Sequence, residues 1–132
     1  METININRAV FCDYCGKGAK LVRGHEIYPQ RQDLASQFFW SCAPCGAYVG
    51  CHKNSDAYPL GRLANAQLRA AKRLAHAAFD PLWQEFGMKR PEAYEWLAGQ
   101  LEISMSQCHI GMFDLDQCRR VQKLATNYKN SL

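Results

Sequence analysis

The chain has 132 residues, and its 16 Lys and Arg against 12 Asp and Glu give a net charge of +4 at pH 7. With 48% hydrophobic residues, the composition excludes an intrinsically disordered protein. No apolar run approaches the roughly 18 residues of a membrane-spanning helix, so we expect no membrane partner. The opening residues lack the apolar run of a secretion signal, and the seven cysteines are an odd number. Both features favour a reducing, cytoplasmic location.

Two CxxCG motifs dominate the first half of the chain: Cys12, Cys15 and Gly16, then Cys42, Cys45 and Gly46. A glycine after the second cysteine can adopt a positive φ, which turns backbone N–H groups towards the sulfurs. Four cysteine sulfurs are the tetrahedral ligand set of a closed, structural zinc site. A pair of disulfides or four unlinked buried thiols are the alternatives, which the doubled motif disfavours. We therefore predict one structural Zn²⁺ on Cys12, Cys15, Cys42 and Cys45, with Fe²⁺ as the alternative ion.

Short apolar segments around these motifs predict a zinc ribbon over residues 8–52, a small antiparallel sheet held by the ion. Its expected strands are residues 8–11, 19–22, 26–28, 37–41 and 47–51, with a hairpin turn at 23–25. The two-residue period of a strand puts Phe38 and Trp40 on one face and Phe39 on the other. These aromatics are expected to form core, or alternatively a stacking platform for bases.

The second half of the chain predicts three to four helices within residues 59–129. The apolar spacing indicates helices over 59–79, 81–86, 91–103 and 115–128. Asp80 is expected to cap the second helix, and Asp114 with Gln117 resembles a capping box for the last. The predicted fold class is α+β, with the ribbon packed on the helices as one compact domain over residues 1–132.

The first of these helices has a basic face that carries Arg62, Arg69, Lys72 and Arg73 and no acid before Asp80. Such a face is either solvated or a contact surface for phosphates or an acidic partner. If it binds nucleic acid, Lys20 and Arg23 of the ribbon are expected to assist.

Further cysteines and histidines raise two other hypotheses. A second metal site could use Cys51, His52, Cys108, His109 and Cys118, although their spacing matches no finger pattern and core packing explains the buried thiols equally well. A metal-dependent nuclease could use His76, Asp80 and His109. No phosphate-binding loop or hydrolase motif is present, and we assign no catalytic residue.

Several motifs follow one another in a characteristic order from residue 9 to about residue 121. After the two CxxCG motifs come Ala47-Tyr-Val-Gly50-Cys-His52, Pro59-Leu-Gly61, Phe79-Asp-Pro-Leu-Trp83 and His109-Ile-Gly111, with Cys118 last. This order resembles the small zinc-finger-containing proteins of unknown function that tailed bacteriophages and prophages encode. The resemblance implies a zinc-finger front, a helical rear and synthesis in a bacterial host; it carries no assigned reaction.

The function expected from the sequence is a zinc-ribbon accessory or regulatory protein of a phage or prophage that binds nucleic acid through the basic helix face. The alternative is a module that docks on a host enzyme and modulates it. A metal-dependent nuclease is the third hypothesis, and a non-enzymatic role is favoured over it.

Overall fold

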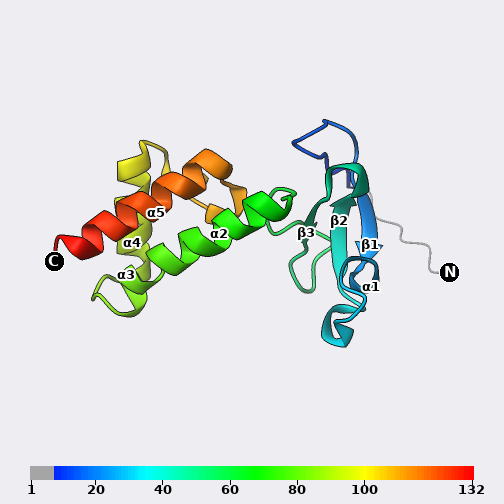
Figure 1. Ribbon diagram of the computed structural model, residues 1–132, viewed down its shortest axis with the longest axis horizontal. Helices are drawn as coiled ribbons and strands as arrows, with labels where there is room; N and C mark the ends of the chain where they lie inside the picture. Colours follow the sequence, from blue (N-terminus) through cyan, green and yellow to red (C-terminus); the bar gives the residue numbers. More distant parts are fainter. Residues whose placement is uncertain (1–7) are drawn as a thin grey trace. The chain divides into compact units, whose positions relative to one another are not determined.

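In the computed structural model, residues 8–132 are described, and Figure 1 shows their helices and strands. The chain divides into two compact units, which we call the N-terminal unit (Met1–Ala66) and the helical unit (Gln67–Leu132). The α+β class with a small antiparallel sheet followed by helices is confirmed. The packing of the ribbon on the helices as one domain stays a prediction.

The N-terminal unit is built on a three-stranded antiparallel sheet of order β1-β2-β3. Its strands are β1 (Lys20–Arg23), β2 (Phe38–Cys42) and β3 (Ala47–Gly50), and its short helical turns are α1 (Gly24–Ile27), η1 (Gln32–Leu34) and η2 (Ala43–Cys45). The register aligns Leu21, Trp40 and Val49 across the sheet. These three side chains therefore share one face.

The two faces of β2 bury different aromatic residues, as the strand period predicts. Trp40 lies in a core with Cys12, Cys42, Ala47, Ala57 and Leu63, and its indole Nε1–H donates to the carbonyl of Ala57 at 2.8 Å. Phe39, on the opposite face, meets the rings of Tyr28 and Tyr48 edge-on at centroid distances of 6.0 and 6.2 Å. Because Phe39 and Trp40 are both buried, neither is a free platform for bases.

Two expected strands are absent from this sheet. Residues 26–28 fall in and after the helical turn α1, and residues 8–11 contribute a single bridge between Phe11 and Gly18. The backbone N–H of Gly24 donates to the carbonyl of Gln37 at 2.7 Å, which closes the segment between β1 and β2. Strand β1 therefore pairs with β2, and the hairpin expected at 23–25 is wrong.

The helical unit contains four helices: α2 (Ala66–Phe79), α3 (Pro81–Gln84), α4 (Arg90–Leu101) and α5 (Leu115–Asn130). Two 3-10 turns, η3 (Met105–Gln107) and η4 (Ile110–Met112), connect α4 to α5. Its buried side chains include Phe79, Leu82, Leu97, Ile110, Phe113 and Val121. No helix within residues 8–132 is both long and apolar enough to cross a lipid bilayer.

Helix α2 begins at Ala66, seven residues after the expected start at residue 59. The preceding segment instead extends the hydrogen bonding of β3, because Leu60 donates to the carbonyl of Gly50 at 2.9 Å and Ala64 pairs with Tyr48. Arg62 lies in this segment and therefore not on the helix. The expected basic helix face loses one of its four cations.

Candidate metal centre

The first CxxCG motif forms a tight knuckle between the bridge residues Phe11 and Gly18. Gly16 has a φ of 74°, in the left-handed region, and its N–H donates to the carbonyl of Cys12 at 2.8 Å. The N–H of Cys12 donates to the carbonyl of Lys17 at 2.9 Å. These bonds reverse the chain and turn both cysteines to the same side, as the motif predicts.

The second motif lies between β2 and β3. Cys42 ends β2, the 3-10 turn η2 carries Cys45, and Gly46 follows with a φ of 62°. The N–H of Gly46 donates to the carbonyl of Ala43 at 3.0 Å. Sheet pairing thus fixes the position of this knuckle, because Cys42 and Ala47 are partners in the register of β2 and β3.

The four sulfur atoms of Cys12, Cys15, Cys42 and Cys45 all lie within 4.8 Å of one another. The sulfurs of Cys15 and Cys42 are 3.7 Å apart. A tetrahedral ion with zinc–sulfur bonds of about 2.3 Å places its sulfurs about 3.8 Å apart. The four side chains therefore fit one zinc ion, which has no further open position.

The thiols of this cluster ionise unequally. The backbone N–H of Lys17 lowers the pKa of Cys15, against the effect of burial. Burial, and next its neighbour Cys15, raises the pKa of Cys45 to about 12. Four crowded thiols cannot all be charged without a cation, so a divalent ion that binds here must displace protons. The ion's role is structural, because it links a knuckle beside β1 to one at the end of β2.

The other cysteines form no second metal centre within residues 8–132, where the four knuckle cysteines are the only group of three or more candidate ligands. Cys108 and Cys118 are buried in the helical unit, with exposed fractions of 2% and 0%. The sulfur of Cys108 lies 3.6 Å from the carbonyl oxygen of Tyr94. In the N-terminal unit, Cys51 bridges to Pro59 and His52 packs against the ring of Tyr58.

One of the contacts that the nuclease hypothesis requires is present in the structure. The Nδ1 atom of His76 lies 3.3 Å from a carboxylate oxygen of Asp80. Asp80 continues the helical backbone from α2, and its side chain makes no capping bond to α3, so the capping role expected of its carboxylate is wrong. His109 joins no metal-binding group with this pair in the described part of the chain.

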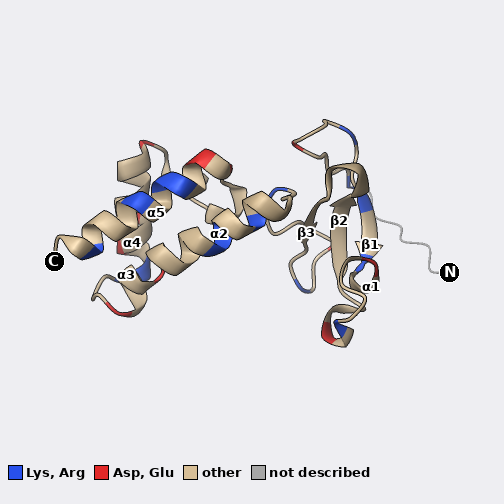
Figure 2. Cartoon of the chain, in the orientation of Figure 1, with Lys and Arg blue, Asp and Glu red and all other residues tan. Residues whose placement is uncertain are grey.

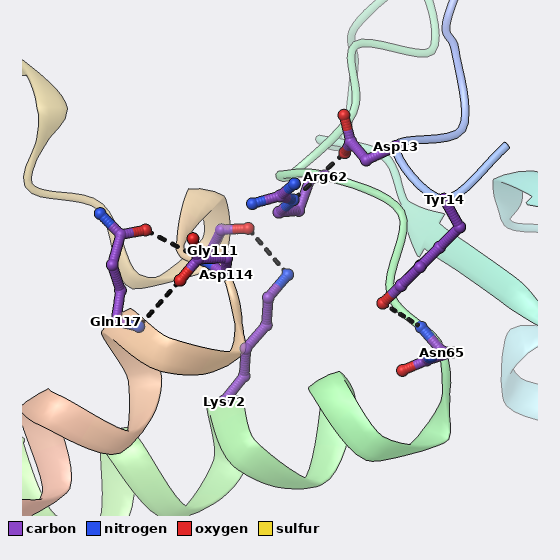
Figure 3. Close-up of polar contacts among 8 residues, drawn as sticks. All are labelled: Asp13, Tyr14, Arg62, Asn65, Lys72, Gly111, Asp114 and Gln117. Atoms are coloured by element: carbon purple, nitrogen blue, oxygen red, sulfur yellow. Dashed lines mark hydrogen bonds and ion pairs between the residues drawn. The ribbon is translucent and has the colours of Figure 1, made fainter. Parts of the chain in front are cut away.

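Among the cations expected at a nucleic-acid interface, Arg62, Lys72 and Arg23 contact residues of their own unit. Arg62 pairs with Asp13 at 3.1 Å, and the ammonium of Lys72 donates to the carbonyl of Gly111 at 2.8 Å (Figure 3). Arg23 lies 4.3 Å above the ring of Phe38 and donates to the carbonyl of Ser36. These side chains therefore have structural roles beyond any contact with phosphate.

The remaining expected cations are Arg69, which is half-buried on α2, Arg73, which is exposed on the same helix, and Lys20, which is exposed on β1. The sequence reasoning missed a second group of exposed cations on α5: Arg119, Arg120 and Lys123 (Figure 2). Their signal was three cations within five residues of one predicted helix. The net charge of the segment does not reveal this group, because the acids within residues 91–132 offset its cations.

Comparison with known proteins agrees with this centre. A family model described as a zinc-finger-containing domain matches residues 8–128. No curated protein and no solved structure matches the chain. The match spans both knuckles and most of the helical unit, so the family model covers the sulfur cluster and the helices alike. The chain belongs to the family of zinc-finger-containing domains, and its four knuckle cysteines hold one structural zinc ion.

Proposed function

We propose that this zinc-binding protein is an accessory or regulatory factor that binds nucleic acid through exposed cations of its helical unit. The observation that carries the proposal is the charge of α5. After Asp116, this helix carries Arg119, Arg120, Lys123 and Lys129 and no acid. Figure 2 shows the cations along α5 beyond its acidic first turn. Such a surface attracts a polyanion without reading its sequence.

The proposal modifies the interface expected from the sequence. Arg73 is exposed on α2 and stays in the proposed contact surface of the helical unit. Lys20 is exposed on β1 and remains a separate candidate contact in the N-terminal unit. Arg62 contributes less, because Asp13 already neutralises it. The group on α5 takes the place of the longer basic helix.

The test is fluorescence anisotropy of the zinc-loaded protein against labelled single-stranded and duplex oligonucleotides over a range of salt concentrations. We expect binding that weakens with salt, and a triple variant R119Q/R120Q/K123Q that lowers the salt slope on duplex DNA by about two to three, since each phosphate contact contributes about 0.9. The matched control, R119K/R120K, keeps the charge and should keep the slope. An unchanged slope in the triple variant removes α5 from the interface, and absent binding at low salt overturns the proposal.

A second candidate function, docking on a host protein, is favoured by two exposed aromatic side chains at the first knuckle. Phe11 is 61% exposed and Tyr14 is 45% exposed. Aromatic residues are enriched at protein interfaces. In either case the resemblance to phage and prophage proteins supports a role in the cytoplasm of a bacterial host. The F11S variant separates the two candidates, because it should leave nucleic-acid binding unchanged and weaken capture of a protein partner.

A further inference from the structure

The helical unit has a cavity of about 330 Å³ where α4 begins. Its lining combines nitrogen donors, a phenol and apolar side chains, and contains no acid: Arg90, Pro91, Tyr94, Met105, Cys108 and His109. The residues come from the first five positions of α4 and from the 3-10 segment that follows this helix. The zinc site and the cations of α5 do not use any of them.

Arg90 is held in place by aromatic rings. Its guanidinium carbon lies 4.9 Å from the centre of the Tyr94 ring and 5.6 Å from that of Trp83. Within residues 8–132 no carboxylate forms an ion pair with Arg90. A guanidinium that stacks on rings keeps its N–H donors available at its edge, which suits the bidentate binding of a phosphate.

The other walls suit an anion that carries an attached organic group. His109 is exposed and adds ring nitrogens, and Tyr94 adds a hydroxyl. Burial raises the pKa of Tyr94, so this hydroxyl keeps its proton and remains a donor. Pro91 and the exposed Met105 form an apolar part of the lining. The buried thiol of Cys108 closes the cavity wall.

We propose that this cavity binds a phosphomonoester, with Arg90 and His109 on the phosphate and Met105 against the attached group. The identity of this ligand, the terminal nucleotide of a nucleic-acid strand, rests on the proposed function. A terminal phosphate can enter a cavity of this size by itself, whereas a phosphate within a strand must bring both neighbouring nucleotides along the surface. The cations of α5 would then supply affinity for the strand, and Arg90 would recognise its end.

The first experiment uses the zinc-loaded protein and the free ligands AMP, inorganic phosphate and adenosine in calorimetric titrations. We expect AMP to bind and adenosine to bind at least about tenfold more weakly, because the charge-assisted bonds are lost. R90Q should weaken AMP binding about tenfold or more. K89Q is the matched control, since Lys89 is an exposed neighbour outside the lining and loses the same charge.

H109Q provides a second variant, at an exposed position, in case R90Q disturbs the folding of α4. It should weaken AMP binding while the far-ultraviolet circular dichroism stays unchanged. The inference is overturned if AMP and adenosine bind equally, or if R90Q and K89Q have the same effect. Binding of inorganic phosphate alone, without a gain from the nucleoside of AMP, overturns the part assigned to Met105.

The second experiment separates this inference from the proposed function. Labelled oligonucleotides of one sequence, with and without a terminal phosphate, are compared at two salt concentrations. If the phosphorylated strand binds more tightly and R90Q abolishes this difference, both the proposed function and the inference are supported. Equal binding of the two strands leaves the proposed function standing and overturns recognition of the strand end. Binding of AMP without binding of either strand overturns the proposed function and keeps the cavity as a site for a free nucleotide.

Discussion

Gly24, at the junction of β1 and α1, is a glycine whose missing side chain is a packing requirement. A Cβ atom here would overlap the carbonyl oxygen of Leu34 and lie 3.3 Å from the ring of Phe39. We expect G24A to lower the free energy of unfolding of the N-terminal unit by at least about 1–3 kcal/mol, because overpacking forces the backbone apart. Chemical denaturation of the zinc-loaded protein, followed by fluorescence, measures the change.

Gly18 supplies the control for this substitution. A Cβ atom there meets no atom within 4 Å, and its φ lies outside the left-handed region. We expect G18A to change the free energy of unfolding by less than about 0.5 kcal/mol, as for an ordinary surface substitution. Equal stability of G24A and G18A would contradict the close approach of Leu34.

Single residues were predictable from the sequence where a local motif fixes them. The left-handed glycines Gly16 and Gly46 belong to motifs that need a positive φ, and both have one. Gly24 was not predictable in this way, because the atom that excludes its side chain belongs to Leu34, ten positions along the chain. The prediction for Asp80 was wrong because it relied on the adjacent Pro81, which suggested a helix cap. The carboxylate of Asp80 instead faces His76, one helical turn earlier.

At the scale of elements, α5 begins with the capping box that the sequence predicts. The N–H of Gln117 donates to a carboxylate oxygen of Asp114 at 2.8 Å, and the N–H of Asp114 donates to the side chain of Gln117 at 3.0 Å (Figure 3). We expect D114A to lower the free energy of unfolding of the helical unit by about 1 kcal/mol, since an orphan N–H loses its acceptor. Thermal unfolding followed by circular dichroism at 222 nm measures this loss of stability. The midpoint temperature is expected at about 60 °C for a domain of this size.

Asp116 offers a matched control for the cap. It is exposed in the first turn of α5 and carries the same charge, and it makes no capping bond. D116A should therefore cost only the interaction with the helix dipole, about 0.3–1 kcal/mol at low salt and less at high salt. The cost of D114A should persist in high salt. If salt removes both costs equally, the hydrogen bond contributes nothing beyond charge.

The helices were more predictable than the strands because their signals are local. For the last helix, the cap, the apolar stripe and the length all indicate the same bounds. Helix α5 begins where predicted and ends two residues later than predicted. The start of α2 was wrong because Leu60 and Ala64 bond to β3, a partner that no helical period reveals. The strand predicted at residues 26–28 was wrong for a similar reason. Strand β1 pairs with β2 and not with the nearest apolar segment in the sequence.

For the whole molecule, the zinc ion should matter to one unit more than to the other. The N-terminal unit packs two of the four zinc ligands, Cys12 and Cys42, into its own core, whereas the helical unit buries side chains such as Phe79, Leu97 and Val121 without a metal. We expect chelation to unfold the N-terminal unit, because metal-binding free energy is folding free energy there. Amide signals of residues 8–66 should collapse in a proton–nitrogen correlation spectrum while those of α4 and α5 persist.

Thiol labelling checks the same prediction chemically. In the zinc-loaded protein the four knuckle cysteines should be protected, and Cys108 should react slowly because burial raises the pKa of its thiol. After chelation the knuckle cysteines should react quickly and Cys108 should remain slow. Simultaneous exposure of all these thiols would show that the two units unfold as one.

The three tryptophans report on different parts of the molecule. Trp40 is the one tryptophan of the N-terminal unit and is fixed to Ala57 in its core, whereas Trp83 and Trp96 belong to the helical unit. A W83F/W96F protein therefore emits from the zinc-dependent core alone. Its emission would move to longer wavelength as the ion leaves, so the intrinsic fluorescence of Trp40 reports zinc occupancy.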